Sequence, residues 1–473
     1  MKILIASDTY YPTVNGAAYF TFRLSTELAK KGHKVFVISP SKSLDNTVDI
    51  IEGVKVYGVR SIPVMFYDKF RVSPIFMIDK TVKSIVSRIS PDVIHIQNHF
   101  NIGRAVVSAG ESMGIPIVGT NHFMPENLIH YLHLPKATEK KIMQIAWRDF
   151  SKVYGKLDVV TSPTITAANL LKDVGFSKEV LPISCGIDLK RFNPKNNGKY
   201  LFKKYGIPSN LPRLLYVGRL DKDKNVDTII NALPKILKHK KAHLVIGGVG
   251  KLRKELENLV TKLGVSKSVT FLGFVSDKDL PKLYSIANVF ITTGGAELQC
   301  LSALEATATG IPVVAANAVA VPELVQNGKN GFLFPLNNST KLARGVVNII
   351  KDKRIEKRMG SESLKIAKRH DIRKTISSFE EVYRKSIYDK GIKKNSDIQN
   401  LSYFSGGFIF KTLFVIIILL YILEVGLFSP PLTLAEGGTV FKNKIMNSQI
   451  VKKIEDFDNR IKTSVPIKLY NSD

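Results

Sequence analysis

Two carboxylates eight residues apart, Glu297 and Glu305, frame a mostly apolar stretch that leads into a Gly-Ile-Pro turn and a short apolar run. Eight residues are a little over two turns of α-helix. A helix across this stretch would place both carboxylates on roughly one face, the first at its start and the second two turns further on. Paired glutamates are common on solvated helix faces, but the apolar residues between these two favour a helix that is not on the surface. In open α/β sheets, such a strand-to-helix junction is where ligands bind.

Two cations follow the apolar run at residues 214–217. Arg219 and Lys224 belong to the sequence Gly-Arg-Leu-Asp-Lys-Asp-Lys, which would place them at the carboxyl end of a strand. Cations in this position could neutralise negative charge on an anionic ligand or leaving group. Lys222, between them, is better explained as part of a solvated loop. We expect the fixed cations to stand in place of a divalent metal, and we predict no metal site.

Several motifs appear along roughly residues 1–385 in the order in which they occur in family GT4, and the chain thereby resembles the retaining, sugar-nucleotide-dependent glycosyltransferases of that family. The stretch from Glu297 to Glu305 resembles the E-x7-E motif of that family, and Gly-Arg-Leu…Lys resembles its cation motif. The resemblance implies a GT-B fold, in which two Rossmann-like domains face a cleft that holds the active site. It also implies transfer of a hexosyl group from a UDP- or GDP-linked sugar, without a further cofactor. The form of these motifs resembles branches that glycosylate a membrane lipid, with diacylglycerol or a phospholipid headgroup as the favoured acceptor.

The resemblance also implies roles for individual residues. His122 would orient the donor sugar and stabilise charge, Arg219 and Lys224 would neutralise the diphosphate, and Glu297 would lie near the donor hexose. Glu305 would accept hydrogen bonds from the nucleotide ribose. The residues expected to bind the donor are Asn15, Gly16, Gly218, Gly248, Gly250, Val275, Gln299, Cys300, Leu301 and Glu305. Asn15 and Cys300 stand where the family usually has glycine.

Short apolar runs alternate with helical patterns, which predicts an α/β protein with two doubly wound, Rossmann-like domains. We assign residues 1–200 to an acceptor-side domain and residues 201–385 to a nucleotide-sugar-binding domain, with a turn-rich boundary at 193–212. The predicted strands are 2–6, 34–38, 93–96, 117–119, 159–161 and 180–183 in the first domain, and 214–217, 242–247, 269–272, 289–292, 313–315 and 331–334 in the second.

The C-terminal part has a different composition. Residues 386–407 form a basic linker, and residues 408–428 are almost entirely apolar. Their length suffices for a membrane span, which needs about 20 residues. We therefore predict a transmembrane helix there, with a buried or a monotopic helix as alternatives. Because the basic flank is denser on the N-terminal side, the positive-inside rule predicts cytoplasmic catalytic domains. The tail, residues 429–473, indicates no function.

The net charge of +29 over 473 residues points to an anionic partner. No nucleic-acid motif accompanies it, so we expect an anionic membrane surface or a phosphorylated substrate. Two segments that mix aromatic and basic residues are predicted to dock on that surface, namely residues 63–71 and residues 129–135 with the helix that follows them. The apolar stripe of the helix in the second segment is expected to pack on the core. The residues proposed for the acceptor or membrane contact are Phe66, Tyr131, Lys140 and Lys141.

The two cysteines, Cys185 and Cys300, fit a reducing compartment without disulfides. The oligomeric state is left open. Three other functions also remain open: the same chemistry on a soluble or polyprenyl-linked saccharide, a nucleotide-sugar epimerase with the same two-domain fold, and a membrane-tethered, non-catalytic sugar-nucleotide sensor.

Overall fold

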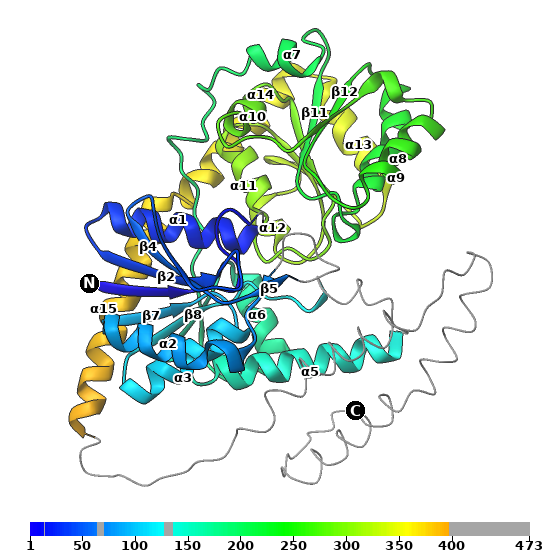
Figure 1. Ribbon diagram of the computed structural model, residues 1–473. Helices are drawn as coiled ribbons and strands as arrows, with labels where there is room; N and C mark the ends of the chain where they lie inside the picture. Colours follow the sequence, from blue (N-terminus) through cyan, green and yellow to red (C-terminus); the bar gives the residue numbers. More distant parts are fainter. Residues whose placement is uncertain (14, 64–70, 127–135, 397–473) are drawn as a thin grey trace, which may run out of the picture. The chain divides into compact units, whose positions relative to one another are not determined.

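The computed structural model describes residues 1–396, apart from 14, 64–70 and 127–135 (Figure 1). The predicted membrane helix at 408–428 and the tail lie outside the described residues, as do Phe66 and Tyr131. No helix within the described part of the chain is long and apolar enough to span a bilayer.

The first sheet has eight strands in the order β10-β9-β8-β7-β1-β2-β4-β3. All neighbours are parallel except β3, which runs antiparallel to β4 at one edge. The strand order reverses between β7 and β1, which makes that point the ligand-binding switch of such a sheet. The strands are β1 (Lys2–Ala6), β2 (Lys34–Pro40), β3 (Thr47–Ile51), β4 (Val54–Val59), β7 (Val93–Ile96), β8 (Ile117–Thr120), β9 (Val159–Ser162) and β10 (Val180–Pro182).

The second sheet has six parallel strands in the order β13-β12-β11-β14-β15-β16. Its order reverses between β11 and β14, so the two strands that precede the predicted catalytic motifs are neighbours at the switch point. The strands are β11 (Arg213–Val217), β12 (His243–Gly247), β13 (Val269–Gly273), β14 (Val289–Thr292), β15 (Val313–Ala316) and β16 (Gly331–Phe334).

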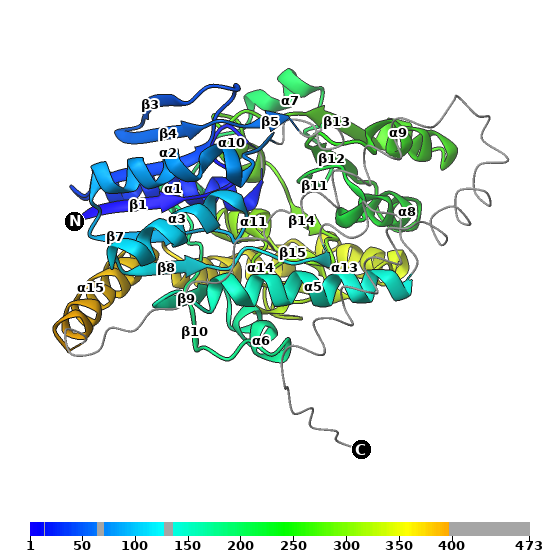
Figure 2. The same ribbon diagram turned by 60° about the horizontal axis from the view of Figure 1, so that its bottom comes forward.

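Helices cover both faces of each sheet (Figures 1 and 2), and each sheet has a buried apolar cluster on either side. This confirms the predicted pair of doubly wound α/β domains, which we call the first and second lobes. The first lobe carries α1 (Gly16–Lys30), α2 (Ile75–Ile89), α3 (Asn101–Met113), α5 (Lys136–Tyr154) and α6 (Ile165–Asp173). The second carries α7 (Tyr200–Tyr205), α8 (Val226–Leu237), α9 (Arg253–Lys262), α10 (Leu280–Ser285), α11 (Leu301–Ala308), α12 (Val321–Leu324), α13 (Ser339–Ile350) and α14 (Lys353–Arg369).

Four strands escaped the sequence analysis. The hairpin of β3 and β4 forms one edge of the first sheet, and β5 (Ile62–Pro63) pairs with β6 (Arg71–Val72). Strand β3 exposes the middle of its length to solvent, so its sequence Thr-Val-Asp-Ile-Ile lacks the buried apolar run by which the other strands were recognised. The remaining two strands have only two residues each.

The last described helix, α15 (Ile372–Ser396), packs on the first lobe although it follows the second (Figure 1). Phe379 and Tyr383 lie in the first lobe's apolar cluster, and the Tyr383 hydroxyl lies 2.7 Å from Nδ1 of His95 on β7. The structure therefore differs from the domain limits that the sequence suggested. Residues 372–385 join the first lobe, and the segment assigned to a basic linker begins as a continuation of this helix.

Candidate active site

Glu297 and Glu305 do not share one helix. Helix α11 begins only at Leu301, so Glu297 lies in the loop after β14 and Glu305 lies one turn into the helix. The expected continuous helix is therefore wrong. The carbonyl of Glu297 accepts a hydrogen bond from the amide of Ala320, and the carbonyl of Leu298 accepts one from the Thr164 hydroxyl. These partners hold the loop backbone outside the helix.

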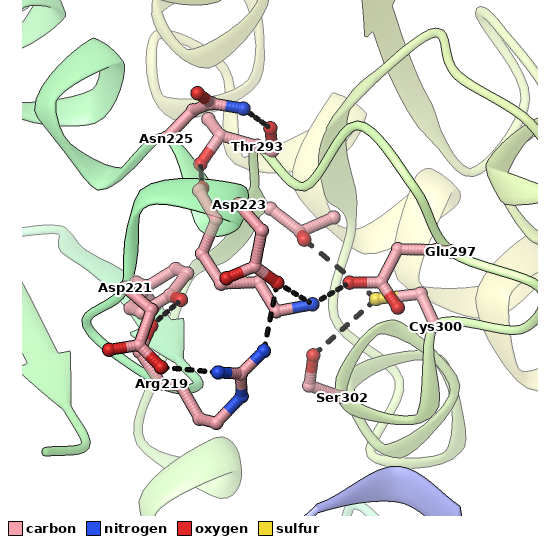
Figure 3. A network of polar contacts seen from close by, with 11 residues as sticks. Arg219, Asp221, Asp223, Asn225, Thr293, Glu297, Cys300 and Ser302 are labelled. Atoms are coloured by element: carbon pink, nitrogen blue, oxygen red, sulfur yellow. Dashed lines mark hydrogen bonds and ion pairs between the residues drawn. The ribbon is translucent and has the colours of Figure 1, made fainter. Parts of the chain in front are cut away.

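The two predicted catalytic motifs meet through an ion pair. Nζ of Lys224, after β11, lies 2.7 Å from Oε1 of Glu297, after β14 (Figure 3). The same ammonium lies 3.2 Å from Oδ2 of Asp223, and Nη2 of Arg219 lies 2.8 Å from that oxygen. Nη1 of Arg219 pairs with Asp221. Burial lowers the pKa of Lys224, but the carboxylates of Glu297 and Asp223 outweigh it and raise that pKa above its usual value. Lys224 is therefore charged at neutral pH.

Asp221 and Asp223 are functional candidates that the sequence analysis missed. They form an Asp-x-Asp pair, which the prediction of a metal-free site passed over, and both carboxylates are paired with Arg219. The side chain of Asp223 is only 4% exposed, and its Oδ1 has no hydrogen-bond partner among the described residues. The alternation of acidic and basic residues from Arg219 to Lys224 was the signal available. In the described ranges, no group of three or more His, Cys, Asp and Glu side chains is placed to hold a metal ion.

The glycines predicted to bind the donor hold two loops against each other. A Cβ atom on Gly248 would lie 1.8 Å from the carbonyl oxygen of Gly218, and one on Gly250 would lie 2.4 Å from that of Leu220. The loop after β12 thus presses backbone to backbone on the loop that carries Arg219. Val275 is buried, and a Cβ atom on Gly247 would lie 3.1 Å from its Cγ2. Whether these residues also contact a donor stays a prediction.

Glu305 faces a tyrosine. Its Oε2 accepts a hydrogen bond of 2.9 Å from the hydroxyl of Tyr284. Burial raises the pKa of Glu305, while the Tyr284 hydrogen bond and the charge of Arg23 lower it in part. Whether Glu305 also binds a ribose hydroxyl stays a prediction.

Cys300 is the N-cap residue of α11 and is buried. Its sulfur lies 3.7 Å from Oγ1 of Thr292 and 3.5 Å from Oγ of Ser302 (Figure 3). Burial raises the pKa of the Cys300 thiol to about 11. The thiol is therefore protonated at neutral pH, which argues against a reactive thiolate at this position.

The donor-binding stretches predicted in the two lobes lie together. Asn15 is the N-cap of α1, and its Oδ1 accepts a hydrogen bond of 2.8 Å from the amide of Ala18. A Cβ atom on the next residue, Gly16, would lie 3.7 Å from Cδ1 of Leu301, the first residue of α11. Gln299 also reaches the first lobe's side, because its Oε1 accepts a hydrogen bond of 2.7 Å from the amide of Cys185.

His122 follows β8 at its carboxyl end and is partly buried. Its Nε2 lies 3.0 Å from Oε1 of Gln97, and its ring lies 5.0 Å from that of Phe20. Burial lowers the pKa of His122 to about 4, so the imidazole is neutral at neutral pH. A neutral ring fits the predicted orienting role, whereas it supplies no positive charge. Gln97, which follows β7, is a further polar residue at this edge that the sequence analysis did not single out.

Lys140 and Lys141 are exposed on α5. Further along this helix, Trp147, Phe150 and Val153 belong to the core of the first lobe. The apolar stripe therefore packs on the core as expected, and the two lysines face solvent.

Family models match both lobes. A model described as Glycosyltransferase Family 4 matches residues 14–191, and a model described as Glycosyl transferases group 1 matches residues 199–365. The chain is 30% identical over 373 residues to an uncharacterized glycosyltransferase of Methanocaldococcus jannaschii, MJ1607, with 74% of this chain and 90% of that protein covered. It is 28% identical over 339 residues to an alpha-monoglucosyldiacylglycerol synthase of Streptococcus pneumoniae, with 71% of this chain and 75% of that protein covered.

Solved structures share the fold. The crystal structure of Anabaena Alr3699/HepE in complex with UDP-glucose superposes with a TM-score of 0.65 at 20% identity, covering 81% of this chain and all of that chain. At this identity the likeness concerns the fold alone, and it supports the predicted GT-B-like arrangement of two parallel-sheet lobes.

Proposed function

Because this chain belongs to the group 1 and family 4 glycosyltransferases, we propose that it moves a hexosyl group from a nucleotide sugar to a membrane lipid, with retention of configuration. A UDP-linked hexose is the first donor to test and a GDP-linked one the second. Diacylglycerol is the first acceptor to test. Family membership favours a transferase over an epimerase or a non-catalytic sensor.

The pairing of Lys224 with Glu297 carries this proposal. Two motifs 73 residues apart place a cation and a carboxylate 2.7 Å from each other, beyond neighbouring strands at the switch point of the second sheet. A glycosyl transfer develops negative charge on the leaving diphosphate and positive charge on the sugar. A cation beside a carboxylate can stabilise both charges.

The division of roles follows from these positions. Lys224 and Arg219 would stabilise the leaving diphosphate, and Glu297 would lie against the donor hexose. Glu305 would accept from the ribose, and neutral His122 would orient the sugar from the first lobe. We propose that the reaction needs no cofactor or divalent metal, because two side-chain cations stand where leaving-group charge develops. Loss of transfer in EDTA, restored by magnesium or manganese, would contradict that part.

The lipid acceptor rests on other observations. The relative from S. pneumoniae is named for the synthesis of monoglucosyldiacylglycerol. The net charge of +29 suits an anionic membrane surface. The apolar segment 408–428 has the length of a membrane helix, and we propose that it anchors the cytoplasmic catalytic lobes to the bilayer. Lys140 and Lys141 would contact anionic headgroups, and Phe66 and Tyr131 remain further candidates for the membrane contact.

The test is a transfer assay in detergent micelles. Radiolabelled UDP-glucose or GDP-mannose is supplied with diacylglycerol, with phosphatidylinositol or without lipid, and products are separated by thin-layer chromatography. We expect labelled lipid with one donor, and release of nucleoside diphosphate that depends on the lipid. Glu297→Gln should lose transfer, whereas Glu257→Gln, the same change in an exposed ion pair of α9, should keep it. Transfer to neither lipid, or diphosphate release that ignores the lipid, would contradict the proposal.

A further inference from the structure

A carboxylate of the second lobe caps a helix of the first. Helix α6 begins after Thr164, whose own hydroxyl oxygen accepts a hydrogen bond of 3.1 Å from the amide of Ala167. The amides of Ile165 and Thr166 donate instead to Glu323 of α12, at 3.4 and 2.6 Å. A residue about 157 positions away in the sequence thus completes the cap of this helix.

This contact is electrostatically favourable for physical reasons that apply to any helix. The first amides of a helix have no partner within it, and the helix dipole makes that end positive. A carboxylate is the strongest acceptor a side chain can offer there. Glu323 therefore links the two lobes at a point where the first lobe has unmet donors.

The same helix start holds the loop of Glu297. The Thr164 hydroxyl donates a hydrogen bond of 2.9 Å to the carbonyl of Leu298, the residue after Glu297. The amide of Ala320, directly before α12, donates to the carbonyl of Glu297 at 3.3 Å. An apolar cluster buried at this junction joins residues of both lobes, namely Met124, Ala167 and Leu298.

The loop that carries Glu297 also contacts the first lobe through Gln299. Gln299 binds the backbone of Cys185 at 2.7 Å and exchanges hydrogen bonds with the Ser184 side chain. The two residues after Glu297 are therefore held from the first lobe, by Thr164 and Cys185. The carbonyl of Glu297 itself is held by Ala320 of the second lobe. The Glu297 carboxylate itself points back to Lys224.

We infer that Glu323 is a positioning residue for transfer. Its hydrogen bonds to the start of α6, which we call the clasp, join the two lobes and thereby fix the position of the loop that carries Glu297. This inference rests on the proposed function. The nucleotide contacts expected from Arg219, Lys224 and Glu305 belong to the second lobe and do not need the clasp. The placement of Glu297 on the hexose does need it.

The experiment separates these two requirements in the full-length protein. Glu323→Gln and Glu323→Ala are compared with wild type and with Glu362→Gln, the same charge change in a surface pair of α14. We expect kcat to fall by roughly tenfold or more in the Glu323 variants, the factor expected for a lost charged hydrogen bond. The UDP dissociation constant should stay within about twofold, because the nucleotide contacts remain. A parallel loss of UDP affinity and kcat, or transfer within about twofold of wild type, would overturn the inference.

A second readout does not depend on activity. Hydrogen exchange at the amides of Ile165 and Thr166 should be faster in both Glu323 variants and unchanged in Glu362→Gln. Thr164→Ser keeps the hydroxyl and should retain transfer. Thr164→Val loses the hydroxyl, and its kcat should fall as in the Glu323 variants. Unchanged amide exchange in Glu323→Ala would overturn the clasp itself. Absence of transfer in the wild-type protein with every donor would instead contradict the proposed function.

Discussion

Glu305 has two carboxyl oxygens with different surroundings. One accepts a hydrogen bond from Tyr284, and the other is the candidate acceptor for a ribose hydroxyl. We expect Glu305→Gln to weaken UDP binding by about 1.5–3 kcal/mol, because a charged acceptor is lost. Isothermal titration calorimetry measures this directly. If Glu305 acted only through Tyr284, Glu305→Gln and Tyr284→Phe would change the melting temperature alike and leave UDP affinity unaltered.

Asp223 is the buried counter-ion that Arg219 and Lys224 share. Asp223→Asn removes one negative charge and leaves the shape nearly unchanged. Both cations lose their common anchor, so we predict a fall in kcat of roughly tenfold or more. UDP affinity should hold or rise, because a repulsive charge is removed. Asp227→Asn, the same change in the first turn of α8, serves as the control. Equal kcat values for both variants would rule out a special role for Asp223.

A buried, neutral histidine makes the free energy of unfolding depend on pH. Burial lowers the pKa of His99 to about 3, whereas the pKa in an unfolded chain is near 6.5. Between these values the unfolded chain holds a proton that the folded protein lacks, so the stability contributed by the neutral ring is full above about pH 6.5 and is lost as the pH falls. His99→Gln should therefore reduce the stability difference between pH 7 and pH 5 by about 2 kcal/mol, measured by urea unfolding. A difference identical to wild type would show that the ring is not neutralised by burial.

At the scale of elements, α15 is the part of the fold that returns to the first lobe. Tyr383 of this helix bonds to His95 inside the core, and the other ring nitrogen of His95 lies 2.7 Å from Thr120. Tyr383→Phe leaves a buried nitrogen without its partner, so we expect a loss of about 1–3 kcal/mol in unfolding free energy. Tyr388→Phe, on the exposed side of the same helix, should change stability little. Denaturant unfolding of both variants tests whether Tyr383 helps to hold α15 on the first lobe. Equal unfolding midpoints for the two variants would contradict this role.

The sequence predicted most of the buried parallel strands, because each is a short apolar run between turns, but it missed β4. It missed what depends on contacts between distant residues. The docking of α15 is one example, since its amphipathic pattern does not say which lobe it covers. The loop at Glu297 is another, because its backbone is held by Thr164 and Ala320 rather than by helical partners. Lys224 and Glu297 were each predicted, but their ion pair required the strand order of the second sheet.

At the scale of the whole molecule, residues 1–396 form one compact unit. We predict that a chain ending after Ser396 folds and binds UDP, because both sheets and their cores lie within it. Such a chain should leave anionic vesicles in high salt, since only surface charge would hold it there. The full chain should resist both salt and carbonate. Aggregation of the shorter chain, or salt extraction of the full one, would show that residues 408–428 do not serve as an anchor.

The charge network in Figure 3 has a consequence for how any anion enters it. Two cations, Arg219 and Lys224, face three carboxylates, so this network carries one negative charge in excess. A diphosphate that bound here would have to take a cation from a carboxylate with which that cation is already paired. Binding is then an exchange of partners. Because dissolved salt weakens the old pairs as well as the new ones, affinity should respond to ionic strength less than two bare cations would suggest.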